Sequence, residues 1–323
     1  MKVKREAFGT LIRMATWLVA VCGLAAGAGQ VAEAAEKPKV CMTAEITPAG
    51  LMKAYEALER PAVGRVAVKI STGEAGNTHY LSPALIGDLV RSVRGTIVEC
   101  NTAYGGSRAA TAMHRQVAKD HGFTAIANVG IMDADGEIAL PVRGGKNLKE
   151  NYVGANFANY DFCIVLSHFK GHAMGGFGGA IKNASIGIAS SGGKAWIHSA
   201  GKSKTNPWGG AQDPFLESMA EAAKSVSDHL DNGKRVLYIN VMNHFSVDCD
   251  CDANPAAPDM HDVGILASLD PVALDQACVD LVYAAKDGKS LIERMESRNG
   301  LHTLAHAAAI GLGSRQYDRV NLD

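Results

Sequence analysis

A short apolar run, Phe162 to Leu166, has the length and β-branched content of a buried strand. Polar side chains and then glycines follow it at once: Ser167, His168, Lys170, His172, Gly175, Gly176, Gly178 and Gly179. In α/β proteins, ligands bind beyond the carboxyl ends of the strands, and glycine lets the backbone approach them closely. This stretch therefore predicts a binding or catalytic site. The alternative is a tight structural turn with solvated histidines and lysines.

The same order of strand, polar loop and helix recurs along the chain, with strands expected at 65–70, 96–100, 125–129, 138–142 and 235–241. Ser82-Pro83 and Asp270-Pro271 each supply an N-cap and a first-turn proline for a helix. This alternation predicts an α/β fold with a largely parallel or mixed sheet flanked by helices. The chain has 323 residues, of which 47% are hydrophobic, and no linker divides it, so we expect a single domain.

The first residues have the features of a signal peptide. A basic start that includes Lys4 and Arg5 precedes an apolar run from 14 to 27, and Ala32-Glu33-Ala34 is an A-x-A cleavage signal. We therefore expect residues 1–34 to be removed and residues 35–323 to form the mature domain. This domain would be periplasmic or otherwise exported, with no stable membrane span. An uncleaved anchor is the alternative, because the apolar run is marginal for spanning a bilayer.

Several classes of function are excluded by charge and motif. The formal net charge is -1 and no Lys/Arg block is present, so we expect no nucleic-acid partner. The dinucleotide fingerprint is broken, because Ile181 stands where the third glycine belongs. No P-loop and no G-x-S-x-G nucleophile elbow occurs either.

A small anion is the ligand that the glycine loop favours. The segment 178–185 is expected to begin a helix, and helix N-termini attract negative charge. Lys170, Lys182 and Lys194 would add positive charge there, unless they are simply solvated. Together with the loop after strand 96–100, this predicts a substrate-binding set: Gly178, Gly179, Lys182, Asn183, Asn101 and Arg108.

Cys249 and Cys251 stand one residue apart in a polar loop after strand 235–241. Two thiolates at this spacing can ligate one metal, which predicts a zinc, iron or iron–sulfur centre. A redox pair and an inert loop are the alternatives. Because the carboxyl ends of parallel strands share one sheet edge, we expect this loop to converge with the site after Leu166. The predicted catalytic residues there are His168, His172 and Lys170, with the histidines as metal ligands or general acid/base groups.

His302 and His306 lie four residues apart on an expected helix and so share one face. No glutamate separates them as a zincin motif requires. We therefore favour two surface histidines of a terminal helix over the alternative, a pair that holds a metal.

Five segments resemble the family known as domain of unknown function 362. They read ECNTAYGG, TAMH, LSHFKGHAMGGFGGAIKNASIGIASS, CDCD and DVGILASLDPVALDQACVDLV. Many members carry a ferredoxin-like insert with iron–sulfur cysteines after the stretch that matches 193–202. Here, residues 205–214 contain no cysteine, so the implied association with iron–sulfur chemistry is weakened.

These features together predict an exported metal- or cofactor-binding protein. The form we favour is a redox enzyme that acts on a small anionic substrate, with a redox partner. The alternative is a non-catalytic periplasmic carrier of a metal or small anion. An enzyme needs an open metal position and a pocket of convergent titratable groups, whereas a carrier needs a closed ligand set.

Overall fold

The computed structural model describes residues 36–323, of which Lys37–Asp323 form one compact unit. The predicted signal peptide lies outside the described residues. Within 36–323, no helix combines the length and the apolar character needed to cross a bilayer.

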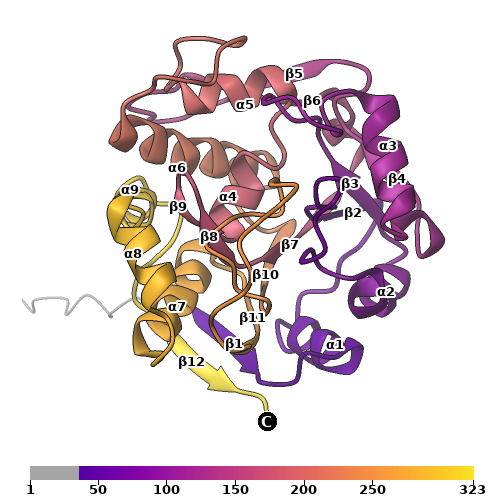
Figure 1. Cartoon of the computed structure of the whole chain (residues 1–323), viewed down its shortest axis with the longest axis vertical. Coiled ribbons are helices and arrows are strands. Elements are labelled where there is room, and N and C mark those ends of the chain that lie inside the picture. The colour runs from indigo at the N-terminus through magenta and orange to yellow at the C-terminus, as the bar shows by residue number, and fades with distance from the viewer. Residues whose placement is uncertain (1–35) are drawn as a thin grey trace, which may run out of the picture. The chain divides into compact units, whose positions relative to one another are not determined.

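An eight-stranded sheet forms the centre of the domain, in the order β12-β1-β11-β10-β7-β2-β3-β4 (Figure 1). All neighbouring strands pair in parallel except β11, which runs antiparallel to both β1 and β10. The predicted α/β fold with a largely parallel sheet and one domain is therefore confirmed. The strands are β1 (Lys39–Thr43), β2 (Val66–Lys69), β3 (Thr96–Glu99), β4 (Val129–Ile131), β7 (Phe162–His168), β10 (Val236–Met242), β11 (Gly264–Ser268) and β12 (Asp318–Asn321).

Helices cover both faces of this sheet, which explains why its central strands are continuously apolar. In β7, Phe162, Ile164 and Leu166 pack into the core that includes α1 and α2. Cys163 and Val165 face the opposite core, which is built with α4, α6, α7 and α9. The helices are α1 (Pro48–Glu56), α2 (Pro83–Ser92), α3 (Thr111–Asp120), α4 (Ala180–Ser185), α5 (Ser191–His198), α6 (Gln212–His229), α7 (Pro271–Ala284), α8 (Lys289–Ser297) and α9 (His302–Ala309).

Both predicted helix caps are present. The Ser82 hydroxyl accepts a hydrogen bond from the N–H of Leu85 at the start of α2. Asp270 accepts from the N–H groups of Val272 and Ala273 at the start of α7. Each cap satisfies backbone donors that the first helical turn leaves without a partner.

The prediction was wrong for the fourth strand. Residues 123–125 form a 3₁₀ turn, and β4 begins only at Val129. Alanine, which suits helical turns, starts the predicted segment, and of residues 125–129 only Val129 belongs to β4, which pairs with β3. The short strand predicted at 138–142 does exist as β5 (Glu137–Pro141), paired antiparallel with β6 (Glu150–Gly154) outside the main sheet.

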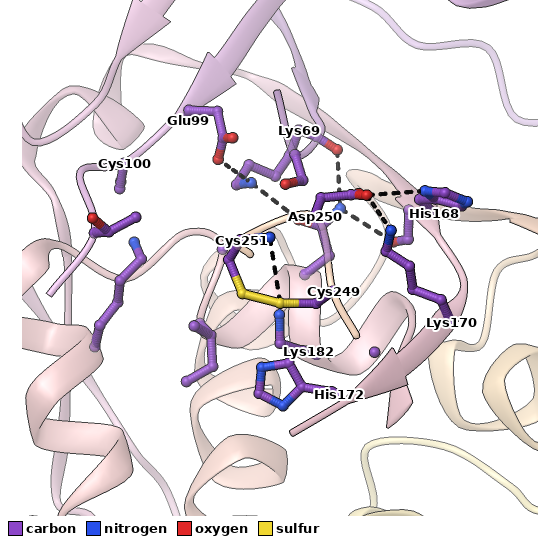
Figure 2. A pocket seen from close by; sticks show the side chains of 18 of the residues that line it. Lys69, Glu99, Cys100, His168, Lys170, His172, Lys182, Cys249, Asp250 and Cys251 are labelled. Atoms are coloured by element: carbon purple, nitrogen blue, oxygen red, sulfur yellow. Dashed lines mark hydrogen bonds and ion pairs between the residues drawn. A yellow bond between two sulfur atoms is a disulfide. The ribbon is translucent and has the colours of Figure 1, made fainter. Parts of the chain in front are cut away.

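Four parallel strands, β3, β2, β7 and β10, are neighbours and end at the same edge of the sheet. Beyond β7 the chain folds into a small hairpin of β8 (Lys170–His172) and β9 (Gly176–Gly178), and then enters α4. The loop after β10 carries the two cysteines to the same edge (Figure 2). This shared edge is where the candidate site lies.

Candidate functional site

A small cavity, which we call the inner cavity, lies at the carboxyl ends of β2, β3 and β7. Its volume is about 90 Å³, enough for a few water molecules or one small anion. The walls come from the strand ends, the β8–β9 hairpin, α4 and the loop 249–251. Ten predicted site residues line it: His168, Lys170, His172, Gly178, Gly179, Lys182, Asn183, Arg108, Cys249 and Cys251.

A second and larger space of about 390 Å³, the outer cleft, adjoins the inner cavity. Both spaces are lined by Thr102, Tyr104, His172, Cys249 and Cys251. These side chains therefore form the wall between the two spaces. Trp208, 58% exposed, stands at the outer cleft.

The inner cavity carries more positive than negative side chains. Among residues 36–323, two carboxylates line it, Glu99 and Asp250. Five cationic side chains surround them: Lys69, Arg108, Lys170, Lys182 and Lys194. Because an unbalanced buried charge is costly, this surplus favours a negatively charged ligand.

Glu99 forms ion pairs with two of the cationic side chains that line the cavity. Its oxygens lie 2.9 Å from Lys69 Nζ and 3.2 Å from Arg108 Nη1, and Arg108 also contacts Glu74 at 3.2 Å. Burial alone would raise the pKa of Glu99, but the charges of Lys69 and Arg108 lower it to about 2. This network therefore keeps Glu99 ionised and occupies both cations.

Asp250 is paired in the same way. Lys170 Nζ forms a short contact with Asp250 Oδ1, and His168 Nδ1 lies 3.2 Å from the same oxygen. His168 Nε2 donates to the carbonyl of Asn243 at 2.6 Å. Both nitrogens of His168 therefore face protein acceptors, so this histidine orients Asp250 and offers no lone pair to the cavity.

In the described chain, Lys182 has no carboxylate partner, whereas Lys69, Arg108 and Lys170 each form an ion pair with a carboxylate. Within residues 36–323, no hydrogen bond or ion pair joins its ammonium to an acceptor, and Figure 2 shows it directed toward the disulfide. Burial lowers the pKa of Lys182 to about 8, because removal from water disfavours the charged form. Lys194, which is also buried, donates to the carbonyl of Ala189 at 2.6 Å. Lys182 is thus the cation best placed to meet a ligand.

His172 presents a defined nitrogen to the cavity. Its Nδ1 accepts from the backbone N–H of Gly175 at 2.8 Å and of Met174 at 3.3 Å. Burial lowers its pKa well below the usual value, so the ring is neutral at pH 7. A neutral imidazole whose Nδ1 accepts must carry its proton on Nε2. His172 therefore offers a hydrogen-bond donor next to Lys182.

Cys249 and Cys251 are joined by a disulfide, the oxidised alternative that their spacing left open. One ring nitrogen of His172 and the two sulfur atoms lie within 4.8 Å of one another. The expected convergence of the cysteine loop with the histidine loop is therefore present. These three residues are a candidate His/Cys metal cluster, but the disulfide has no thiolate to offer, so a metal would need the reduced pair.

The N-terminus of α4 does not bind an anion in the way predicted. The N–H groups of Ala180 and Ile181 donate to the buried carboxylate of Asp275 at 2.7 and 2.9 Å. A Cβ on Gly179 would lie 2.3 Å from Asp275 Oδ1, so this glycine admits the carboxylate rather than a ligand. An acidic residue on α7 thus occupies the position, a long-range contact that local sequence does not reveal.

Of the predicted substrate-binding residues, Asn101 stands apart from the inner cavity. Its side chain contacts Thr111 and His114 at the base of α3. Lys69 and Glu99 were missed, because each ends an apolar strand and was counted as part of it. A lone charged residue at the last position of a buried strand is the signal that identifies them.

The two histidines of α9 are not simply solvated. His302 Nε2 lies 3.2 Å from Glu217, and His306 Nε2 lies 3.2 Å from Glu221. Glu221 is fully buried and also accepts from the N–H groups of Lys146, Asn147 and Leu148. These histidines stabilise the contact between α6 and α9.

A family model described as "Domain of unknown function (DUF362)" matches residues 66–280, which is most of the described chain. The chain belongs to the DUF362 family. The resemblance seen in the motifs is thereby confirmed, and the matched region holds every residue that lines the inner cavity of this DUF362 protein. No curated protein matches the sequence.

Two solved structures are similar to this DUF362 protein at low sequence identity. One is the lactate racemase apoprotein from Thermoanaerobacterium thermosaccharolyticum, at 13% identity and a TM-score of 0.42, covering 77% of this chain. The other is a Thermotoga maritima protein solved by the Northeast Structural Genomics Consortium, at 15% identity and a TM-score of 0.41, covering 74%. The similarity spans only 57% and 58% of those two chains.

Proposed function

We propose that this DUF362 protein binds a small anionic substrate, such as a carboxylate or phosphate, in the inner cavity. The observation that carries the proposal is Lys182, a largely enclosed ammonium with no acceptor among residues 36–323. The other cations beside it are already held by Glu99, Asp250 or a backbone carbonyl. A bound anion would supply the missing partner.

The neighbouring groups support chemistry on the bound anion. Lys182, with a pKa of about 8, can hold or release a proton near neutral pH, as a general acid or base must. His172 donates a hydrogen bond from a neutral ring, which suits an oxygen that gains negative charge. We therefore favour an enzyme over a non-catalytic carrier, which would need no such titrating group.

Export is part of the proposal. The basic start, the apolar run and the Ala32-Glu33-Ala34 signal support cleavage and a periplasmic or otherwise exported mature chain. An oxidising compartment would also favour the Cys249–Cys251 disulfide. No nucleic-acid partner and no stable membrane span belong to this function.

A transition-metal site is the second candidate, supported by the grouping of His172, Cys249 and Cys251. Reduction would give two thiolates and an imidazole, which suit zinc or iron and leave a fourth position open. An iron–sulfur centre fits less well, since such clusters take four protein ligands and this group supplies three. Coordination by His172 Nε2 would also move its proton to Nδ1 and break two backbone contacts.

Isothermal titration calorimetry with sulfate, phosphate, acetate and oxalate tests the proposal. We expect Lys182→Met to weaken binding by about 1–3 kcal/mol, the usual value of a charged hydrogen bond, which is about 5–150-fold. Lys234→Met, at an exposed lysine, should bind as the wild type does. Equal affinities in Lys182→Met and wild type would contradict the anion site. Tight zinc binding by the reduced protein, lost in Cys249→Ser, would instead favour the metal site.

A further inference from the structure

The Cys249–Cys251 disulfide closes a loop with a single intervening residue. A bridge over so short a loop removes little conformational freedom from the unfolded chain, so it stabilises the fold little. The loop is held by other contacts instead. The carbonyl of Asp250 accepts from the N–H of Glu74 at 2.8 Å, and the Asp250 carboxylate is paired with Lys170. Cutting the sulfur–sulfur bond would leave this loop in place.

The two sulfur atoms have different surroundings. As whole residues both cysteines are partly buried, but within the group that they form with His172, Cys249 is buried and Cys251 is exposed. Both line the outer cleft, so a second molecule can approach Cys251 from there. Thiol–disulfide exchange begins with attack of a thiolate on an accessible sulfur. The geometry therefore makes Cys251 the sulfur that is attacked and Cys249 the one that leaves.

The surroundings of Cys249 favour a leaving thiolate. Its sulfur already accepts the backbone N–H of Cys251 at 3.3 Å. The imidazole of His172 and the ammonium of Lys182 border the same part of the cavity (Figure 2). Hydrogen-bond donors and a positive charge beside this sulfur stabilise the electron pair that it takes when the bond breaks, so they favour Cys249 as the leaving sulfur.

From this asymmetry we propose that Cys249–Cys251 is a thiol–disulfide exchange centre for an external dithiol. A thiolate of the dithiol attacks Cys251 Sγ, the bond between the two cysteine sulfurs breaks, and its electron pair leaves with Cys249. The second thiol of the dithiol then attacks the first sulfur of the same dithiol, which is bound to Cys251 in the mixed disulfide, and Cys251 is released as a thiolate. The dithiol becomes a disulfide, and its two electrons and two protons pass to Cys249 and Cys251.

The remaining cysteines of the described chain provide an internal control. Cys41, Cys100, Cys163 and Cys278 are buried, and burial raises the pKa of Cys100 and of Cys163 to about 12. Thiols of this kind are unreactive in the folded state. Alkylation mapped by peptide mass spectrometry therefore distinguishes the exchange pair from all four.

The first experiment treats the full-length folded protein with dithiothreitol, followed by alkylation and peptide mapping. We expect Cys249 and Cys251 to be reduced and labelled while the four buried thiols stay unlabelled. Reoxidation with glutathione disulfide should restore the bond. A pair that is reduced only under unfolding conditions, or thiols that glutathione disulfide does not oxidise, would overturn the proposal.

The second experiment tests the assigned direction with single-cysteine variants and glutathione disulfide. Cys249→Ser should form a mixed disulfide at Cys251 at least about tenfold faster than Cys251→Ser forms one at Cys249, because access limits the reaction. Lys182→Met should slow reduction of the wild-type pair by about three- to tenfold, whereas Lys234→Met should not. Faster reaction at Cys249 would overturn the direction. Sulfate binding by the Cys249→Ser/Cys251→Ser variant tests the anion site separately.

Discussion

Two groups of buried charges in this domain are built on opposite principles. In the α6–α9 cluster, which consists of Glu217, Glu221, His302, His306, Lys146 and Asn147, every buried carboxylate has several donors. In the inner cavity, Glu99 and Asp250 are equally well paired, but Lys182 meets no acceptor among the described residues. The first group is complete in itself, whereas the second needs a ligand.

This difference separates charges that stabilise the fold from charges that bind. Enclosing a charge costs several kcal/mol unless partners offset the loss of water. The α6–α9 cluster offsets that cost within the chain and so contributes to stability. For Lys182, no partner in the described chain offsets the desolvation cost. The pKa of its ammonium is therefore lowered to about 8, and binding of an anion beside it is favourable.

The largest effect is expected from Glu221→Ala, which breaks the complete group. Three backbone N–H groups and His306 would lose their acceptor, and such a loss typically costs about 3–5 kcal/mol of unfolding free energy. Urea denaturation measures this change. Anion affinity of the folded variant should stay unchanged, and a parallel loss of affinity would show that the two groups are coupled.

The second largest effect is expected from acid, which should remove the stabilisation that the Glu99 ion pairs give to the fold. The pKa of Glu99 is about 2 when folded, below its ordinary value of 4.5, so its stabilisation is complete above about pH 4.5. It is lost as pH falls through 2, and it amounts to about 3 kcal/mol. Unfolding free energy measured from pH 6 to pH 2 should fall less steeply in Glu99→Gln. Equal slopes would contradict the pairing.

A smaller effect concerns the unpaired lysine. Because the charged form of Lys182 exists below its pKa of about 8, sulfate affinity should be level below that pH and fall above it. Above this pKa, sulfate affinity should fall by at most about tenfold per pH unit, which is about 1.4 kcal/mol of binding free energy. Sulfate stays fully ionised throughout, so calorimetry at pH 7, 8 and 9 reports the lysine. In Lys182→Met the affinity should be lower and independent of this titration.

The smallest effect is on stability. Lys182→Met removes a charge with no acceptor and retains most of the apolar side chain, so unfolding free energy at pH 7 should rise by about 1 kcal/mol or stay level. Denaturation in sulfate-free buffer is the measurement. A loss of more than about 1 kcal/mol would mean that Lys182 has a structural partner after all.

Much of this architecture follows from local sequence signals. The apolar run Phe162 to Leu166 and the capped helices at Ser82 and Asp270 identify the α/β layers, because periodicity and capping are local. The convergence of Cys249 with His172 also follows, since parallel strands end at one edge.

What local signals do not contain is how distant side chains pair. Asp275 fills the N-terminus of α4 from 95 residues away, and Glu99 joins Lys69 across two neighbouring strands. Whether a lysine such as Lys182 ends with a partner depends on these contacts. The cationic loop was therefore predictable, whereas the particular residue left for a ligand was not.

The pairing of β1 bears on how such a chain completes its fold. β1 begins at Lys39, soon after the predicted cleavage point, yet its neighbours are β11 and β12 near the other end. Pairings between such distant segments form slowly, because loop closure precedes any gain from contact. In a chain exported N-terminus first, as proposed above, β1 would wait for β11 on one side and for β12, among the last residues, on the other. This edge of the sheet would therefore close last.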